Sequence, residues 1–153
     1  MILYGILKDK GFHVRSIGPS TTLDEAVEEL VRFNIGSLVV CEPTSRGADV
    51  HMIGIITERD ILRAQATHKA RLDESTVANA MTTDLITAEP GTEIEVAMRL
   101  MTKHRVRHLP VMDGGRLLGI VSIGDVMKAQ LQELTLSTWY MSRELADRNG
   151  MWT

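Results

Sequence analysis

A duplicated segment constrains this chain more than any other feature. Residues 54–61 read GIITERDI and residues 119–126 read GIVSIGDV, an offset of 65. Further upstream the offset is 71, and it pairs Pro19 with Pro90, Thr21 with Thr92, Leu23 with Ile94, Ala26 with Ala97, Ile35 with Val106, Leu38 with Leu109 and Val40 with Val111. The chain is therefore an internal repeat. Its first copy carries six extra residues in CEPTSRGADVH, whose composition indicates a lengthened turn.

Each copy predicts the order strand, helix, strand, strand, helix. In TLDEAVEELVRF, apolar residues recur at helical spacing and the acidic residues form a solvated face. The second copy repeats this stripe, and Thr92-x-x-Glu95 predicts a capping box for its helix. Its strands are expected in VRHLPV and LLGIV, joined by a hairpin at Asp113-Gly114-Gly115. Because a unit of ~50 residues cannot bury a core alone, we expect two α+β units packed with pseudo-two-fold symmetry.

The composition predicts a folded chain of ordinary domain size. It has 153 residues, of which 44% are hydrophobic and 24% charged. A net charge of −3 argues against nucleic-acid binding. No apolar run approaches the ~20 residues of a membrane span, and MILYGILKDK lacks the basic leader of a signal peptide, so a cytoplasmic location is the default expectation. Cys41 is expected at the end of a buried strand rather than at a reactive site.

The two duplicated segments share a hydroxyl and a carboxylate three residues apart. Thr57 and Asp60, and likewise Ser122 and Asp125, have the spacing of a helix cap. Capping alone explains both pairs, and duplicated helices need duplicated caps. The alternative is that the pairs also bind a ligand. The motif by itself leaves both interpretations open.

The frame around these pairs resembles a known family. A Glu-Pro entry, an amphipathic helix, the strand sequence RHLPVMDGGRLLGIVSIGDV and a second divergent copy resemble a tandem cystathionine-β-synthase (CBS) domain pair of the stand-alone bacterial type, over about residues 12–132. The resemblance implies a first CBS domain at 12–67, a linker at 68–83, a second CBS domain at 84–132 and a helical tail at 133–153. It also implies a disc-like Bateman module of two β-α-β-β-α repeats.

In that family, adenosine-containing ligands such as AMP, ADP, ATP, NAD(H) or S-adenosylmethionine bind in the clefts between the repeats. The resemblance therefore implies that Asp60 and Asp125 accept hydrogen bonds from ribose hydroxyls. Thr57 and Ser122 would bind the sugar or the α-phosphate. Arg107 occupies a position from which a guanidinium group reaches a phosphate.

Further residues complete the expected binding set. Arg59 could supply a second cation, whereas its counterpart is Gly124 and that of Arg107 is Gly36, so the two clefts are not expected to be equivalent. Segments 35–38 and 106–109 match the adenine slots. The expected ligand-binding residues are Ile35, Ser37, Thr57, Arg59, Asp60, Val106, Arg107, His108, Ser122 and Asp125.

Three classes of function compete. The leading hypothesis is a regulatory module that senses energy or redox state through an adenosine-containing ligand, with no metal required. The second is a structural homodimerisation module with non-binding clefts. The third, an enzyme, is disfavoured because the sequence has no P-loop, no G-x-G-x-x-G and no nucleophile with its base. His104 and His108 do not predict a metal site, since a strand is expected from about Val106.

The expected partners are the small molecule, a second copy of the chain and a downstream protein of unknown identity, with no nucleic acid and no membrane.

The C-terminal tail provides evidence on assembly. Trp139, Tyr140 and Trp152 lie near the end of the chain, in a segment expected to be helical until Gly150. They predict either a homodimer interface or a tail folded over its own repeats. In both cases truncation at Leu136 is expected to harm stability or assembly.

Overall fold

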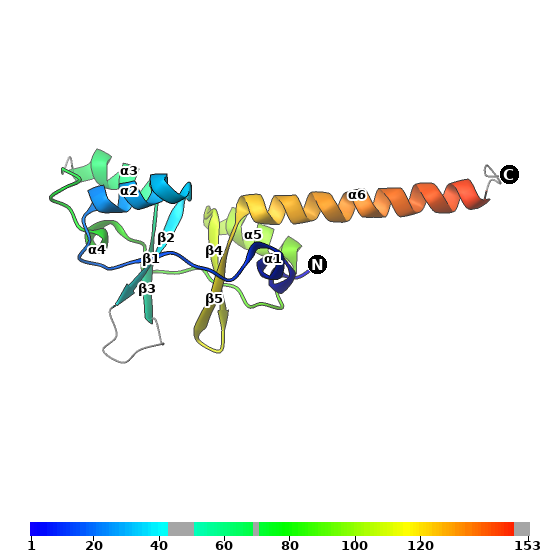
Figure 1. Cartoon of the computed structure of the whole chain (residues 1–153), viewed down its shortest axis with the longest axis horizontal. Coiled ribbons are helices and arrows are strands. Elements are labelled where there is room, and N and C mark those ends of the chain that lie inside the picture. Colours follow the sequence, from blue (N-terminus) through cyan, green and yellow to red (C-terminus); the bar gives the residue numbers. More distant parts are fainter. Residues whose placement is uncertain (43–50, 69–70, 149–153) are drawn as a thin grey trace. The chain divides into compact units, whose positions relative to one another are not determined.

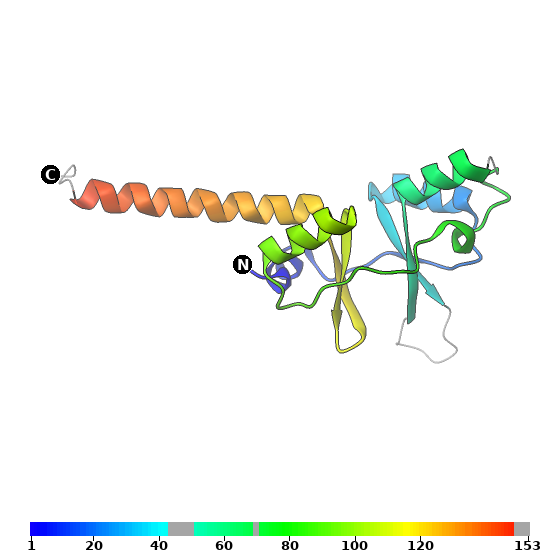
Figure 2. The same cartoon turned by 180° about the vertical axis from the view of Figure 1, so that it is seen from behind.

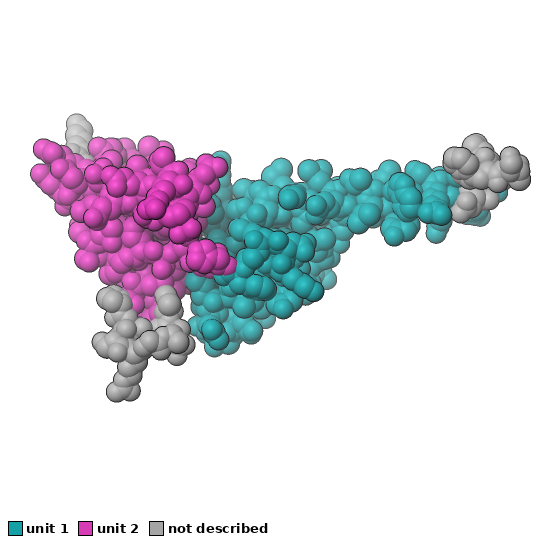
Figure 3. All heavy atoms as spheres, viewed as in Figure 1, with its two compact units in different colours: residues 1–12, 86–153 teal, residues 13–85 magenta. Residues whose placement is uncertain are grey.

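The computed structural model describes residues 1–42, 51–68 and 71–148, which form two compact units (Figure 1; Figure 2). Unit 2 is contiguous and comprises residues 13–85, whereas unit 1 comprises residues 1–12 together with residues 86–153 (Figure 3). The predicted lengthened turn, Gly150 and Trp152 lie outside the described residues.

Unit 2 has the predicted order of strand, helix, strand, strand, helix. Its elements are β1 (Ser16–Ile17), α2 (Leu23–Phe33), β2 (Ser37–Glu42), β3 (His51–Thr57), α3 (Glu58–His68) and α4 (Val77–Ala80). Strand β2 pairs in parallel with β1 and antiparallel with β3. Buried side chains from the helices and the sheet form the core: Leu23, Ala26, Leu30, Leu38, Val40, Ile56, Ile61 and Val77. Helix α4, with four residues, is a short helix in the segment predicted as a linker between the repeats.

Helix α2 has a capping box at its start and a left-handed residue at its end. The Glu25 amide donates to Thr22 Oγ1 at 3.2 Å, and the Thr22 amide donates to Glu25 Oε2 at 3.1 Å. Asn34 ends the helix with a φ of 51°, a conformation that asparagine tolerates. The apolar stripe predicted for this helix includes Val31, but Val31 is not buried. It is 75% exposed and lines an open groove beside α3.

Cys41 lies near the end of β2 and is buried, as expected. Burial raises the pKa of its thiol. The thiolate is therefore a minor species at neutral pH, and thiolate is the reactive form of cysteine. The structure thus supports the structural interpretation of this residue.

Unit 1 contains the second copy. Its elements are α1 (Leu3–Lys10), α5 (Ile94–His104), β4 (His108–Asp113), β5 (Arg116–Ser122) and α6 (Ile123–Arg148). The predicted hairpin joins β4 to β5, with positive φ values at Gly114 and Gly115. The first strand expected in this copy is reduced to a bridge between Ala88 and Val111. The buried core consists of Leu3, Ile6, Leu7, Ala88, Ile94, Ala97, Met101, Leu109, Val111, Val121, Val126 and Ala129.

The capping box predicted at Thr92 and Glu95 is wrong. The N-cap of α5 is Glu93, without a side-chain capping bond, and Thr92 Oγ1 instead accepts from the Glu89 amide at 3.2 Å. The amide of Ile94 donates to the carbonyl of Met1 at 3.1 Å. Because the N-cap is Glu93 and not Thr92, Glu95 is the second residue of the helix and not the third, where a capping box requires it.

Helices α1 and α4 hold corresponding places in the two units. The amides of Leu3 and Tyr4 donate to the carbonyls of Thr92 and Pro90, and the amides of Val77 and Ala78 donate in the same way to Thr21 and Pro19. Both acceptor pairs are related by the offset of 71 found in the sequence. The repeat therefore extends into the segment that leads into each copy. We call residues 1–12 and 77–85 the lead-in segments.

Helix α6 is the longest element, with 26 residues. Val126 and Ala129 bury its first part in unit 1, and Glu133 Oε1 accepts from the N-terminal amino group at 2.8 Å. The C-terminal part of α6 extends away from the body of unit 1 (Figure 1; Figure 2). Trp139 and Tyr140 are more than half exposed, so this part of the helix does not fold back over unit 1. Within the described residues, no helix combines the length and apolar character needed to span a membrane.

Candidate ligand-binding site

Each unit holds one hydroxyl–acid pair at the start of the helix that follows its antiparallel strands. In unit 2 the amide of Thr57 donates to Asp60 Oδ2 at 2.9 Å, and the amide of Asp60 donates to Thr57 Oγ1 at 3.3 Å. The Thr57 hydroxyl also donates to Asp60 Oδ2, at 3.0 Å. These reciprocal bonds form the predicted cap of α3.

The other oxygen of Asp60 also has a partner. Thr82 Oγ1, from the lead-in segment of unit 2, donates to Asp60 Oδ1 at 3.1 Å. Asp60 is 9% exposed and is the one charged residue among the buried side chains of the described chain. Its buried carboxylate is therefore satisfied by neutral donors on both oxygens.

Unit 1 repeats the cap with a different outer partner. The amide of Ser122 donates to Asp125 Oδ2 at 2.8 Å, and the amide of Asp125 donates to Ser122 Oγ at 3.2 Å. Lys10, from the lead-in segment of unit 1, places its Nζ 2.6 Å from the same Oδ2 and 3.0 Å from the carbonyl of Ile120. The bonds to Ser122 and Lys10 thus converge on one carboxylate oxygen.

The ion pair changes the acidity of Asp125. Burial by itself raises the pKa of this carboxyl, but the hydrogen bonds from Lys10 and from the Ser122 amide, with the charge of Lys10, lower it further than burial raises it. The net pKa lies below the usual value of an aspartate. Asp125 is therefore an anion at neutral pH beside a fixed cation.

The strand register places one more predicted residue opposite the hydroxyl of each pair. Ser37 lies opposite Thr57 in the β2–β3 ladder, and His108 lies opposite Ser122 in the β4–β5 ladder. The first amide of the following helix donates to the residue just before the neighbouring strand. In α3 the amide of Glu58 donates to the carbonyl of Gly36, and in α6 the amide of Ile123 donates to the carbonyl of Arg107. Arg107, whose side chain is exposed, thus lies at the helix end that carries Asp125. A helix start beside an arginine is a favourable place for an anion.

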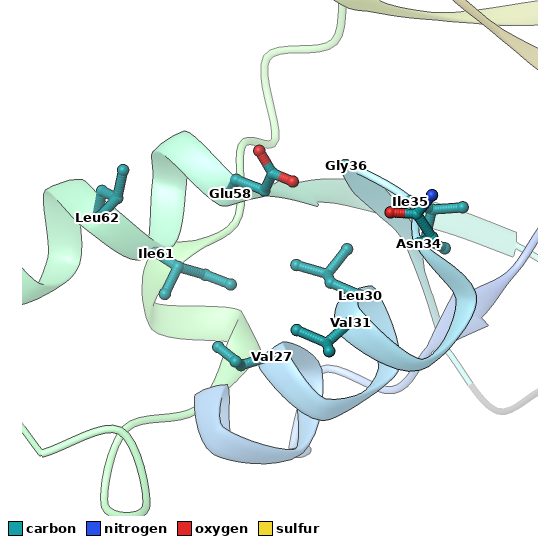
Figure 4. A pocket seen from close by; sticks show the side chains of 9 residues that line it. All are labelled: Val27, Leu30, Val31, Asn34, Ile35, Gly36, Glu58, Ile61 and Leu62. Atoms are coloured by element: carbon teal, nitrogen blue, oxygen red, sulfur yellow. The ribbon is translucent and has the colours of Figure 1, made fainter.

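The remaining predicted residues are Ile35, Arg59 and Val106. Arg59 lies in the first turn of α3, with an exposed side chain, and Val106 packs against the core of unit 1. Ile35 packs against the core of unit 2 and lines an apolar groove of about 500 Å³ between α2 and α3 (Figure 4). Glu58 is the one charged residue that lines this groove, so the groove offers no cation to a phosphate.

Sequence reasoning missed Lys10 and Thr82, the two residues that donate to the capping acids from outside the caps. Both lie in the lead-in segments, eight or nine residues before the proline that begins the offset of 71. Applying that offset upstream of the prolines would not have aligned the two segments, because their matching amides, those of Leu3 and Val77, are 74 residues apart. At the offset of 71 Lys10 aligns with Met81 and not with Thr82, so the two donors would not have been matched.

His104 and His108, which do not predict a metal site, belong to two different elements. His104 ends α5 and His108 begins β4, with the left-handed Arg105 (φ of 54°) between them. Across the described residues, no cluster of three or more histidine, cysteine or acidic side chains is arranged to hold a metal ion.

The fold and the duplicated caps define a tandem α+β repeat whose units each present an acid at a helix start. A family model for the CBS domain matches residues 12–67 and 77–132, and the chain belongs to this family. It is 40% identical over 114 residues to the mitochondrial CBS domain-containing protein CBSX3 of Arabidopsis thaliana, a match that covers 73% of this chain and 54% of the relative. The chain thus spans about half the length of that protein.

Two solved structures support the same fold. The CBS-domain containing protein ATU1752 from Agrobacterium tumefaciens is 37% identical, with a TM-score of 0.78 over 84% of this chain and 92% of that one. CBSX2, solved in complex with AMP, is 29% identical, with a TM-score of 0.62 over 78% of this chain and 88% of that one. A related CBS pair therefore binds an adenine nucleotide.

Proposed function

We propose that this protein is a regulatory CBS pair that binds an adenosine-containing ligand and reports energy or redox state to another protein. The candidate ligands are AMP, ADP, ATP, NAD(H) and S-adenosylmethionine. One observation carries the proposal, namely the capping carboxylate that stands at a helix start in each unit, held by backbone and lead-in donors. The complex of CBSX2 with AMP supports the ligand class.

The proposed roles follow the chemistry of the side chains. Asp60 and Asp125 accept hydrogen bonds from ribose hydroxyls, because a carboxylate offers several acceptor sites. Thr57 and Ser122 bind the sugar or the α-phosphate. Residues beside each cap receive the adenine or the phosphate: Ile35, Ser37, Arg59, Val106, Arg107 and His108.

The two sites differ in charge, and we propose that the site of unit 1 prefers the anionic ligand. Both oxygens of Asp60 accept from threonine hydroxyls, whereas the bonds from Ser122 and Lys10 leave Asp125 Oδ1 as the oxygen available to a ribose. Lys10 and Arg107 add two cations near Asp125. The residue that corresponds to Arg107 in unit 2 is Gly36.

The second candidate is a structural homodimerisation module that binds no ligand. The exposed apolar side chains of α6 favour it, because such residues mark a protein interface. A homodimer is compatible with both candidates. Nucleotide binding decides between them.

Titration calorimetry on the protein stripped of nucleotide tests the proposal, with AMP, ATP, NADH and S-adenosylmethionine as ligands. Asp125→Asn keeps an acceptor for the Ser122 amide but loses the negative charge, so we expect it to raise the dissociation constant of the bound nucleotide by at least about tenfold. The matched control is Thr22→Ala, which removes the cap of α2 and leaves the Ser122–Asp125 cap intact. Absence of binding by all four ligands would leave the homodimerisation module as the function.

A further inference from the structure

We propose that the second half of α6 is a dimerisation helix that pairs with α6 of a second copy of this chain, through one heptad stripe. The stripe consists of Met127, Leu131, Leu134, Thr138, Met141 and Leu145. This inference specifies the surface that forms the proposed homodimer, and it is independent of ligand binding.

The spacing of the stripe is that of a coiled coil. Its members follow one another at alternating intervals of four and three residues, which is the a/d pattern of a heptad repeat. From Met127 to Arg148 the pattern runs for three heptads, or about 30 Å of helix. Its five apolar side chains are all between 52% and 63% exposed. A continuous apolar seam of this length is therefore open on the surface of α6.

The helix needs a partner to persist beyond the body of unit 1. The segment after Glu133 contains Thr, Ser, Trp and Tyr residues of modest helix propensity, over about fifteen positions. Isolated helices of that length are marginal in water, and helical stability in proteins comes mostly from packing of an apolar face. The seam supplies such a face.

The polar residues in and beside the seam are suited to a helical interface. Thr138, the polar member of the stripe, donates its hydroxyl to the carbonyl of Leu134 at 2.9 Å. Thr135 and Ser142 donate in the same way to Leu131 and Thr138, at 2.8 and 2.9 Å. Because these hydroxyls already have partners within the helix, covering them with a second helix leaves no donor unsatisfied.

The flanks of the seam favour an identical partner. The e and g positions between Leu131 and Leu145 are Thr135, Ser137, Ser142 and Glu144, so three of the four are small and uncharged. Charged flanks normally select partners by attraction or repulsion. Neutral flanks impose no repulsion between two copies of the same helix, and a second copy has a seam of equal length and pattern.

The opposite face of α6 is apolar as well but is arranged differently. Trp139 and Tyr140 contact each other edge to face, with ring centroids 5.2 Å apart. The Arg143 guanidinium carbon lies 5.3 Å from the Trp139 ring centroid. These side chains are partly shielded by one another and lie off the heptad stripe. They therefore serve as a control surface.

Two double variants with matched exposure separate the faces. Leu134→Gln with Met141→Gln alters the seam at side chains that are 56% and 63% exposed, and Leu136→Gln with Tyr140→Gln alters the opposite face at 57% and 60%. In sedimentation experiments we expect the wild type to be a dimer. The seam variant should dissociate at least about a hundredfold more readily, while the control variant keeps the wild-type constant.

Amide hydrogen exchange provides the second measurement. We expect residues 134–148 to be protected in the dimeric wild type and to lose that protection in the seam variant, while the unit 1 core is unchanged. Thr138→Leu should tighten the dimer at least about tenfold, because it completes the apolar seam.

Three results would overturn the proposal: a monomeric wild type at about 100 µM, equal effects of the two double variants, or unprotected amides in 134–148 of a dimer. Nucleotide calorimetry on the seam variant tests ligand binding separately. Retained affinity in a monomeric variant would show that the two proposals succeed or fail on their own.

Discussion

Gly54 and Gly119 hold corresponding places in the two units, at the start of the duplicated segments. A methyl group on Gly54 would lie 2.9 Å from both Met81 Sδ and the carbonyl oxygen of Thr82. On Gly119 it would lie 2.7 Å from a methyl carbon of Leu7. In each unit the lead-in segment thus crosses the strand at a distance that only glycine permits.

We predict that Gly54→Ala destabilises the protein by about 2–3 kcal/mol and Gly119→Ala by about 1–2 kcal/mol. The larger cost at Gly54 arises because the Thr82 carbonyl is fixed by its backbone bridge to Ile55 and cannot retreat. At Gly119 the end of the Leu7 side chain can shift. Urea unfolding measures the free energy of unfolding of both variants. Gly91→Ala is the control, since no atom lies within 4 Å of its added carbon. Equal stability of the Gly54 and Gly91 variants would contradict the close crossing.

The ion pair between Lys10 and Asp125 predicts a pH effect. Because the pKa of Asp125 in the folded protein is below its unfolded value of about 3.9, the pair stabilises the fold above that pH. This contribution is lost as the pH falls through the folded pKa. Lys10→Gln should raise the pKa of Asp125, since burial then acts with less opposition.

A carboxyl-carbon NMR titration of Asp125 checks the direction of this shift, with Lys8→Gln on the same helix as control. The stability lost in Lys10→Gln should be larger at pH 7 than at a pH below the folded pKa of Asp125, where the carboxyl is protonated in both proteins. An unchanged Asp125 titration in Lys10→Gln would show that the ion pair does not form in solution.

The caps show what sequence spacing can and cannot establish. The pairs Thr57–Asp60 and Ser122–Asp125 form the predicted reciprocal caps. Thr92 has the same spacing to Glu95 and forms none, because α5 begins one residue later, with Glu93 as its N-cap. The spacing of two residues does not by itself determine where a helix begins. The ligand roles of the acids stay a prediction.

At the scale of elements, α1 was the helix that sequence reasoning missed. Leu3, Ile6 and Leu7 have helical spacing and are buried in unit 1. Eight residues are too few to form a stable helix alone, so its local signal was weak. Helices α2 and α5 and strands β2 to β5 carried apolar patterns long enough to be predicted. The first strand expected in the second copy is reduced to a bridge at Ala88.

We predict that Leu7→Ala destabilises unit 1 by about 2–5 kcal/mol, because the side chain is fully buried against Gly119 and the surrounding core. Hydrogen exchange should show faster opening of α5 and β5, with no change in α2. Lys8→Ala, an exposed neighbour on α1, is the control. Loss of protection confined to α1 itself would mean that this helix is not part of the unit 1 core.

At the scale of the whole molecule, the difference in charge between the two sites predicts that stabilisation by a ligand depends unequally on Asp60 and Asp125. A ligand at one hundred times its dissociation constant stabilises the fold by about 2.7 kcal/mol. With ATP, we expect Asp125→Asn, whose affinity is at least about tenfold weaker, to lower this gain to about 1.4 kcal/mol or less. Asp60→Asn should keep most of the gain, since Lys10 and Arg107 belong to unit 1. Thermal unfolding with and without ATP measures it. The reverse pattern would place the anionic ligand at the pair in unit 2.

The tandem repeat itself could be predicted from the sequence, whereas the membership of the two units could not. The offsets of 65 and 71 identify two copies in chain order. Unit 1, however, combines residues 1–12 with residues 86–153, because α1 packs on the second copy. Repeat offsets align residues, but they do not state which copy a connecting segment packs against. The domain bounds at 12–67 and 84–132 accordingly remain a prediction.

This interleaving has a consequence during synthesis on the ribosome. Unit 2 is contiguous, so its core is available once residue 85 has emerged, while the core around α1 still lacks Leu109 and Val121. At translation rates of about 5–20 residues per second, Leu7 waits for Val121 for roughly 6–23 s. Helix α1 therefore leaves the ribosome before unit 2 but is buried after it, and the nascent chain exposes Leu3 and Leu7 while unit 2 is already folded.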